Sequence, residues 1–256
     1  MTVTERCMRI MEILTKRKVI ATRELESLLY CSTSTLRRDL IRLENQKRII
    51  REQGEVRIVL SKNIDYSYES RLDDRTRLKK LIAEIASTFL GQNQAIFLDS
   101  SSTTSFILPF LSEFDNLQVI TNSVYLPPQL NKLSNISLFV TGGEVSGGTN
   151  SILGNFAVDF LDNFFTDIAF FSCRGIDNKG TYEADYNQAL FKRKMISNSK
   201  KNILLVDSSK FDTKHFFKLT YLDKIDHIIT DKKPSDEFLN TMNQRCEILW
   251  PDIELS

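Results

Sequence analysis

The sequence has few of the side chains that most often bind metals. Its 256 residues include two histidines, His215 and His227, and four cysteines at positions 7, 31, 173 and 246, with no Cys-x-x-Cys or Cys/His spacing. This scatter indicates neither a zinc site nor a disulfide framework, so we expect reduced cysteines and no metal or cofactor. For each isolated histidine a structural or exposed role is the more frequent one, and we expect no catalytic role for either.

Long apolar runs are also missing. No stretch approaches the ~18 apolar residues of a membrane span, and Glu5 and Arg6 place charge at the N-terminus. We find no low-complexity segment and no internal repeat. We therefore expect a soluble, cytoplasmic protein without a membrane partner.

The net charge is close to zero, but it is unevenly distributed. Residues 1–60 hold 13 Lys and Arg against 8 Asp and Glu, a surplus of 5, while the remaining residues hold 21 against 25, a deficit of 4. The total length suffices for a small domain and a larger one with its own core. A basic N-terminal part favours a nucleic-acid partner for that part.

The stretch CSTSTLRRDLIRLE, residues 31–44, combines hydroxyls, leucines and arginines. Ser32 is a plausible N-cap of a helix that begins at Thr33. The leucines at 36, 40 and 43 then share one face, and the arginines at 37, 38 and 42 lie on the others. Taken alone, this pattern fits a solvated, charged helix about as well as a DNA-binding one.

The flanking segments favour the DNA-binding interpretation. Residues 3–18 have an amphipathic pattern with Met8, Met11, Ile13 and Leu14. Residues 22–30 form a shorter helix with Thr22 as a possible cap, and residues 48–60 form a hairpin turning at Gly54. This order predicts a winged helix-turn-helix, in which hydroxyls and arginines contact phosphates and bases. The expected DNA contacts are Ser32, Thr33, Ser34, Thr35, Arg37, Arg38, Arg42, Arg51 and Arg57.

The part after residue 60 predicts a different fold. Residues 61–90 form a linker and a connecting helix with apolar positions at helical spacing (Leu78, Leu81, Ile82, Ile85, Ala86 and Phe89), and its charged first half, residues 69–77, is either a solvated face or a transmitter of motion. From residue 91 to 256, short apolar strands alternate with helices. This alternation predicts an α/β domain with a mainly parallel sheet covered on both faces.

Polar loops follow five of these strands in succession. They read DSSSTTS, TNS, TGGEVSGGTN, CRGIDNKG and DSSKF, and in parallel sheets such loops gather at the carboxyl edge, where ligands bind. Ser102, Thr103 and Thr104 lie where a strand passes into a helix, whose N-terminal amides favour an anion such as phosphate. Ordinary helix capping by the same hydroxyls is the alternative. Lys192 and Lys210 could neutralise the ligand.

The motifs resemble those of one family. Residues 31–44 fit the pattern V-S-x-x-T-I-R-R-D-L-x-x-L-E, with Cys31 for valine and Leu36 for isoleucine, and this looks like the helix-turn-helix signature of the DeoR family of bacterial transcription regulators. The family's later motifs recur in order as Asp99 to Thr103, Thr121-Asn122, Gly142-Gly143, Gly175-Ile176-Asp177 and Asp207 to Phe211. The resemblance covers nearly the whole chain.

The resemblance implies a repressor of sugar-metabolism genes that is relieved by a phosphorylated sugar. We also expect a homo-oligomer, because one small recognition helix covers too few base pairs to select an operator by itself. It also implies a second domain that shares its fold with ribose-5-phosphate isomerase and the CoA transferases. Ser101 departs from the loop glycine of the family, and Gln188 from its common glutamate. The expected ligand contacts are Asp99, Ser100, Ser101, Ser102, Thr103, Thr104, Thr121, Asn122, Gly142, Gly143, Gly175, Asp185, Lys192 and Lys210.

Two other classes of function remain open. An isomerase or transferase would need a positioned carboxylate, for which Glu144 and Glu183 are the candidates, although neither lies in a catalytic motif. A DNA binder that senses no ligand is the other alternative. Because of the basic helix-turn-helix, we favour a regulator that is not an enzyme.

Overall fold

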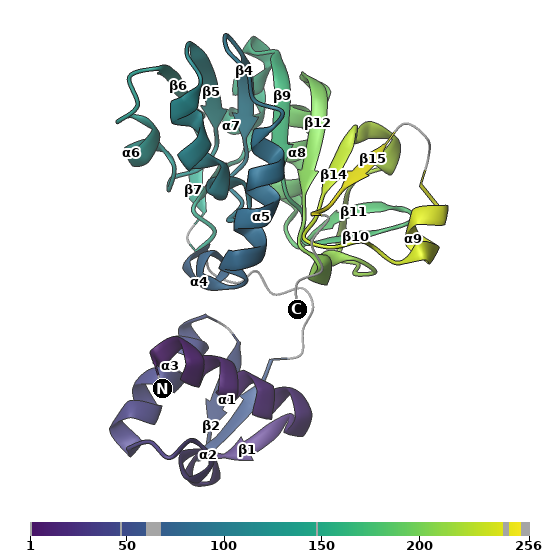
Figure 1. Cartoon of the computed structure of the whole chain (residues 1–256). Helices are drawn as coiled ribbons and strands as arrows, with labels where there is room; N and C mark the ends of the chain where they lie inside the picture. Colours follow the sequence, from purple (N-terminus) through teal and green to yellow (C-terminus); the bar gives the residue numbers. More distant parts are fainter. Residues whose placement is uncertain (1, 47, 60–67, 147, 243–245, 252–256) are drawn as a thin grey trace. The chain divides into compact units, whose positions relative to one another are not determined.

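The computed structural model describes residues 2–46, 48–59, 68–146, 148–242 and 246–251. The chain divides into two compact units, Met1–Ser70 and Arg71–Ser256 (Figure 1). The domain limits expected from the sequence, 1–60, 61–90 and 91–256, place the connecting segment across this division. Residues 60–67 of that segment lie outside the described residues.

The first unit is a winged helix-turn-helix, as the sequence predicted. Its helices are α1 (Val3–Arg17), α2 (Thr22–Leu29) and α3 (Thr33–Asn45). Its strands β1 (Val19–Ala21), β2 (Ile49–Glu52) and β3 (Glu55–Ile58) form an antiparallel sheet in the order β1-β3-β2. Gln53 and Gly54 both have positive φ, which matches the tight hairpin turn whose twist suits the flanking strands.

The helix starts are set by side-chain caps in two of three cases. Thr2 and Glu5 form a reciprocal capping box on α1, and Ser32 accepts a hydrogen bond from Thr35 N at 3.3 Å at the start of α3, as expected. The expectation for Thr22 was wrong, because it is the first residue of α2 and the cap position is Ala21, which offers no side-chain acceptor.

The apolar face of α1 also differs from the expected one. Cys7, Ile10 and Leu14 are buried, whereas Met8 is exposed. These three residues repeat at spacings of three and four, and they pack with Leu36, Leu40 and Leu43 of α3 in one core. The expected leucine face of α3 is therefore confirmed.

The connecting helix is broken in two. Helix α4 spans Tyr68–Asp73 and α5 spans Thr76–Ser87, and Arg75 between them has a left-handed φ of 52° that ends the first helix. Ile82, Ala83 and Ala86 of α5 pack into the core of the second unit, as expected for this helix. Lys79 of the same helix is buried too, which its charge did not suggest.

The second unit contains the predicted parallel sheet. The seven strands lie in the order β15-β14-β12-β9-β4-β5-β6, and every neighbouring pair is parallel. Their bounds are β4 (Ala95–Leu98), β5 (Leu117–Thr121), β6 (Ile136–Val140), β9 (Thr166–Phe171), β12 (Ser199–Leu205), β14 (His227–Ile229) and β15 (Glu247–Leu249).

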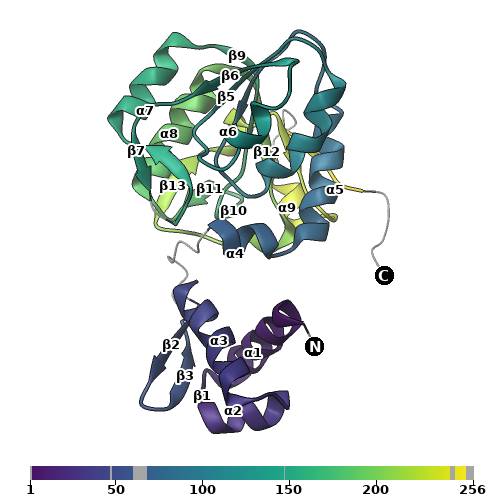
Figure 2. The ribbon, with the colours of Figure 1, turned by 90° about the vertical axis from the view of Figure 1, so that its left-hand side faces the viewer.

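Helices cover both faces of this sheet. Helix α5 and the 3-10 helix η1 (Thr104–Glu113) contribute to the core on one face, and α7 (Asn155–Phe160) and α8 (Tyr186–Ser197) to the core on the other. Figures 1 and 2 show α5 and α8 on opposite sides of the strands. Strands β4, β9 and β14 inside the sheet are mostly buried as a result, which explains their continuous apolar runs, whereas the edge strands β6 and β15 are partly exposed.

Several elements escaped the sequence analysis. Strands β10 (Gly175–Asp177), β11 (Gly180–Glu183) and β13 (Phe217–Thr220) form a separate antiparallel sheet, and β7 (Glu144–Ser146) pairs with β8 (Ser151–Leu153). The helix expected after residue 103 is 3-10 rather than α and contains Pro109. The remaining short helices are α6 (Pro127–Leu130), η2 (Leu161–Asn163), η3 (Ser208–Lys210), η4 (Leu222–Lys224) and α9 (Asp236–Asn240).

Candidate functional site

Helix α3 presents a cationic surface to solvent. Arg37, Arg38 and Arg42 are exposed, while the leucines of the same helix are buried. The Arg38 side chain turns back along the helix, because its Nε donates to Ser34 O at 3.3 Å. The sequence therefore divides α3 into a packed face and an exposed arginine face, as predicted.

The hydroxyls at the start of α3 have different roles. Ser32 caps the helix, and its Oγ lies 3.1 Å from Ser34 Oγ and 2.9 Å from Thr35 Oγ1. Thr33 Oγ1 donates to Glu26 Oε1 of α2 at 2.6 Å, which ties the two helices of the motif together. The four hydroxyls thus lie at the N-terminal end of the helix that we expect to contact DNA, and two of them also stabilise the motif.

A small cationic cavity lies beside this helix. Its volume is about 220 Å³, and Arg6 of α1 pairs across its floor with Asp39 of α3, with 2.7 Å between Arg6 Nε and Asp39 Oδ2. Asp39 is buried, so this ion pair fixes α1 against α3. Because one carboxylate faces three arginines, the cavity keeps a positive charge. The lining residues are Val3, Arg6, Thr35, Arg38, Asp39 and Arg42.

The two arginines of the wing are not equivalent. Arg57 on β3 is exposed, whereas Arg51 on β2 forms two hydrogen bonds from its guanidinium to Glu44 Oε2, at 2.8 and 2.6 Å. Arg51 lowers the pKa of Glu44 by these hydrogen bonds. The charge of Arg51 is therefore balanced within the domain, and its contribution to the positive surface is smaller than that of Arg57.

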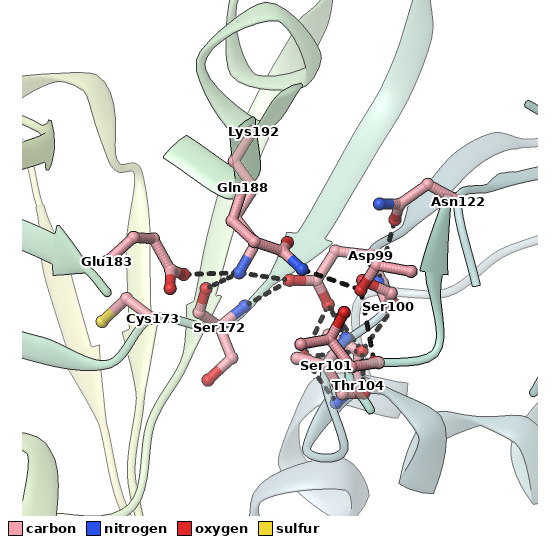
Figure 3. A network of polar contacts seen from close by, with 12 residues as sticks. Asp99, Ser100, Ser101, Thr104, Asn122, Ser172, Cys173, Glu183, Gln188 and Lys192 are labelled. Atoms are coloured by element: carbon pink, nitrogen blue, oxygen red, sulfur yellow. Dashed lines mark hydrogen bonds and ion pairs between the residues drawn. The ribbon is translucent and has the colours of Figure 1, made fainter. Parts of the chain in front are cut away.

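In the second unit, Asp99 at the end of β4 organises the first polar loop. Its side chain is fully buried, and Oδ1 accepts from Ser101 N at 3.0 Å, Ser101 Oγ at 2.5 Å and Thr104 Oγ1 at 2.7 Å. Its Oδ2 accepts from Ser172 N at 3.1 Å. Asp99, Ser101 and Thr104 thus bind one another and shape the loop (Figure 3).

A second set of contacts joins this loop to neighbouring strands. Asn122 Oδ1 accepts from Ser100 N at 3.0 Å, and Asn122 Nδ2 donates to Ile152 O at 3.2 Å. Ser100 Oγ lies 2.6 Å from Ser151 Oγ of β8, which also accepts from Gln188 Nε2 at 2.7 Å. The structure therefore brings loops distant in sequence to one edge of the sheet, as the succession of polar loops predicted.

Ser102 and Thr103 differ from their neighbours in the loop. Both residues are largely buried, yet among the described residues no acceptor binds their backbone N–H groups and no group binds their hydroxyls. Thr103 directly precedes η1, so these amides lie at the N-terminal end of a helix. Two adjacent N–H groups in this position favour an anion.

Lys192 of α8 is buried between two carboxylates. Its Nζ lies 3.1 Å from Asp99 Oδ2 and 2.6 Å from Glu183 Oε1, and it donates to Ser172 O at 2.8 Å. Burial opposes the charged form, but Glu183 and Asp99 raise the pKa of Lys192 above its ordinary value. All three N–H donors of Lys192 are used within the protein, so its charge balances Asp99 and Glu183.

A cationic cluster lies around Asp207, at the end of β12. Burial and the neighbouring Arg174 and Arg75 lower the pKa of Lys210, while Asp207 opposes them. The Asp207 carboxylate is buried, which favours its neutral form, but Lys210 and Arg75 nonetheless lower its pKa. The sequence pattern pointed to Lys210 but gave no signal for the other two cations. Arg75 is an exposed residue beside Asp73 and Asp74, and Arg174 lies in the loop between β9 and β10.

The other predicted ligand residues have structural roles in this structure. Thr121 Oγ1 accepts from Ser123 N at 3.0 Å, and Asp185 caps α8 by accepting from Gln188 N at 2.9 Å. A Cβ at Gly143 would lie 2.5 Å from Leu153 O, and one at Gly175 would lie 2.1 Å from Thr213 O, so both positions exclude a side chain. Gly142 differs from these residues, because a Cβ added there would meet no other atom within 4 Å.

Within the described part of the chain, other expectations can be compared with the structure. The four cysteines are free, and no group of three or more His, Cys, Asp or Glu could hold a metal ion. Of the two carboxylates considered for catalysis, Glu144 is exposed and Glu183 is paired with Lys192. No described helix has the length and apolarity needed to cross a bilayer.

The fold and the arginine-bearing helix define a class of protein, a winged helix-turn-helix regulator with an α/β sensor domain. Two family models match the chain: the "DeoR-like helix-turn-helix domain" over residues 6–62 and the "DeoR C terminal sensor domain" over residues 74–232. The chain belongs to the DeoR family of transcription regulators, and it is a DNA-binding transcription regulator.

Curated relatives align over almost their full lengths. The HTH-type transcriptional repressor GlcR of Bacillus subtilis is 30% identical over 94% of this chain and 93% of its own. The glycerol-3-phosphate regulon repressor of Escherichia coli is 28% identical over 90% and 92%, and the L-fucose operon activator of the same species is 29% identical over 88% and 93%.

Solved structures with a similar fold are more distant. A D-ribose-5-phosphate isomerase in complex with phospho-erythronic acid has 17% identity over 53% of this chain and 54% of its own, with a TM-score of 0.40. The translation initiation factor eIF-2B of Pyrococcus horikoshii has 12% identity over 88% and 79%, with a TM-score of 0.41.

Proposed function

We propose that this regulator represses genes of sugar metabolism and that a phosphorylated sugar, bound by the sensor domain, relieves the repression. The names of the relatives include regulators of glycerol 3-phosphate and fucose genes, which supports a carbohydrate-derived effector. Both a repressor and an activator occur among them. We choose repression because GlcR, which is named a repressor, is slightly more similar to this chain than the L-fucose operon activator is.

The observation that carries the effector proposal is the pair of backbone amides at Ser102 and Thr103, which bind no acceptor in the described part of the chain. A phosphate oxygen accepts strong hydrogen bonds from such amides, and the cations around Asp207, including Lys210, add positive charge to the same domain. Ser101 and Thr104 support the loop through Asp99 rather than contacting the ligand. In this proposal Ser100 and Asn122 are also supporting residues.

For operator DNA we propose the exposed side chains of α3 and Arg57 of the wing as the contact surface. Arg37 and Arg38 are candidates to read bases, because they lie on the N-terminal half of the helix. One such helix covers too few base pairs to select an operator, so we propose that a symmetric homo-oligomer binds repeated half-sites.

We propose no enzymatic activity. A carboxylate that acts as a catalytic base must be free to take a proton from a substrate. Glu183 is buried against Lys192, and Glu144 lies exposed on β7 without a neighbouring catalytic motif. Incubation with sugar phosphates should therefore produce no turnover.

The test combines ligand binding with DNA binding. Thermal shift with a panel of sugar phosphates and the corresponding unphosphorylated sugars should reveal stabilisation by phosphorylated members alone. The same compounds should then weaken binding to an operator selected from a random DNA pool, by about 5- to 150-fold for a coupling of about 1 to 3 kcal/mol. If no phosphorylated compound changes DNA affinity, the effector proposal is wrong, while the DNA-binding assignment stands.

A further inference from the structure

Gln188 is the third residue of α8, and its side chain points away from the backbone of Asp185, the residue that caps this helix. At this position a glutamine commonly reaches back to the backbone of the N-cap residue. Here only the backbone of Gln188 takes part in the cap, by donating to Asp185 Oδ1, while the side chain is 8% exposed and reaches Ser151 on β8. Figure 3 shows it inside the polar network of Asp99 and Lys192.

The partners of Ser151 determine which end of the amide remains unpaired. Ser151 Oγ lies 2.6 Å from Ser100 Oγ and donates to Thr149 O at 3.3 Å. Because its single hydrogen is directed to Thr149 O, Ser151 Oγ is an acceptor toward Ser100 Oγ and toward Gln188 Nε2, which lies 2.7 Å away. Gln188 Oε1 is therefore directed away from Ser151, and no donor among the described residues binds this buried atom.

A buried acceptor without a donor costs about 1 to 3 kcal/mol, so a ligand that supplies a donor regains this amount on binding. The Gln188 amide is neutral, whereas the carboxylates of Asp99 and Glu183 carry one more negative charge than Lys192 balances. A glutamate at 188 would add a further negative charge near the loop of Ser102 and Thr103. A neutral amide accepts a hydrogen bond without repelling an anion.

We propose that Gln188 is a specificity-determining residue of the sensor site. Its Oε1 accepts a hydrogen bond from a hydroxyl group of a phosphorylated polyol, whose phosphate binds the amides of Ser102 and Thr103. This inference rests on the proposed function, because it assigns the hydroxyl-bearing part of the same effector. It also predicts that the sensor distinguishes polyol phosphates from phosphate esters of equal charge that lack hydroxyls.

The experiment uses the full-length chain and matched probes. Isothermal titration measures binding of inorganic phosphate, propyl phosphate, glycerol 3-phosphate, ribose 5-phosphate and fructose 1-phosphate to the wild type. It is repeated with Gln188→Met, which keeps the size but removes the acceptor, with Gln188→Glu, which keeps an acceptor, and with Asn187→Ala, an exposed neighbour on the same helix.

The wild type and Asn187→Ala should bind at least one polyol phosphate about 5- to 150-fold more tightly than propyl phosphate, which corresponds to about 1 to 3 kcal/mol. Gln188→Met should lose this preference but keep its affinity for inorganic phosphate. Gln188→Glu should keep the preference while binding every phosphate probe more weakly.

The outcomes separate this inference from the proposed function. If the wild type binds propyl phosphate as well as every polyol phosphate, or if Gln188→Met keeps the preference, the role of Gln188 is refuted and the anion site stands. If the wild type binds none of the probes, inorganic phosphate included, the proposed effector site fails and this inference fails with it. Because the wild-type comparison needs no variant, the inference stays testable if Gln188→Met does not fold.

Discussion

Lys192 of α8 and Asp99 at the end of β4 form a buried ion pair, with 3.1 Å between Lys192 Nζ and Asp99 Oδ2. The pair joins α8, which covers one face of the sheet, to the loop that leads into η1 on the opposite face. Asp99 in turn holds Ser101 and Thr104. The conformation of the candidate anion site therefore depends on a contact made by a lysine whose three N–H donors are all used within the protein.

Removing Lys192 should destabilise the sensor domain strongly. Lys192→Met would leave Asp99 and Glu183 buried without a cation, and breaking a buried pair in this way costs about 3 to 5 kcal/mol. Lys200→Met is the matched control, because Lys200 is 65% exposed and pairs with Asp167 at the surface, so its loss should cost at most about 1 kcal/mol. Urea denaturation of both variants measures the difference, and equal stabilities would show that the buried pair is unimportant.

Lys79 should make the stability of the sensor domain depend on pH. Burial lowers its pKa from 10.5 to about 8, and Nζ donates to Asp74 O at 2.7 Å and to Arg71 O. Between these two pKa values the unfolded chain binds more protons than the folded one, so the free energy of unfolding rises with pH. Below pH 8 the protonated Lys79 is buried in the folded state, and the destabilisation that this burial causes is fully present. When the pH is raised from 8 to 10, the free energy of unfolding of the wild type should increase by about 2 kcal/mol relative to that of Lys79→Met.

This difference is measured by urea denaturation of both proteins at pH 8 and pH 10. Other groups that titrate in this range, such as cysteines and tyrosines, are the same in both proteins and cancel in the comparison. If both proteins change equally, Lys79 is protonated in the folded state as readily as in the unfolded one.

The DNA-binding unit could be predicted from sequence almost completely. Its contacts are local, so the cap at Ser32, the leucine face of α3 and the turn at Gly54 all leave a signal within a few residues. The wrong expectation for the cap of α2 also came from a local signal, the residue type. Thr22 resembles a cap by residue type, but whether it caps depends on where the helix begins.

For the sensor domain, the sequence predicted which loops lie close together but not which of their atoms form hydrogen bonds. Apolar runs predicted the strands because a sheet buried on both faces requires them. Ser101 and Thr104 support the loop, whereas the N–H groups of Ser102 and Thr103 bind no acceptor among the described residues. This division depends on the direction of the Asp99 side chain. The antiparallel strands β10, β11 and β13 were missed because their short runs contain glycine, threonine and lysine.

Arg38 should contribute to operator binding. Arg38→Ala should weaken it by about 1 to 3 kcal/mol, with relaxed base preference if the side chain pairs with guanine, or with a salt slope lower by about one if it contacts phosphate. Arg9→Ala is the control, because Arg9 is an exposed arginine of α1 that pairs with Glu12. Fluorescence anisotropy at several salt concentrations separates the two modes. Unchanged affinity of Arg38→Ala at matched salt would exclude Arg38 from the interface.

The role of the Thr103 amide can be tested by a substitution that removes only the N–H group from the backbone. Thr103 has a φ of −77°, which proline can adopt, and its amide donates to no described residue, so Thr103→Pro loses no internal hydrogen bond. Thr103→Ala keeps the amide and removes the hydroxyl. Comparing the two variants separates the contribution of the backbone from that of the side chain.

We expect Thr103→Pro to melt within a few degrees of Thr103→Ala, and its operator affinity without effector should equal that of the wild type. Its affinity for the sugar phosphate that releases the wild type should fall by about 10- to 150-fold, because hydrogen bonds to charged groups contribute about 1.5 to 3 kcal/mol. Such a loss abolishes release of DNA at effector concentrations that suffice for the wild type, because the effector can shift the equilibrium only by its differential affinity for the two states. A folded Thr103→Pro protein that binds the effector and releases DNA like the wild type would show that the phosphate lies elsewhere, and the cationic cluster around Asp207 would then be the next site to test.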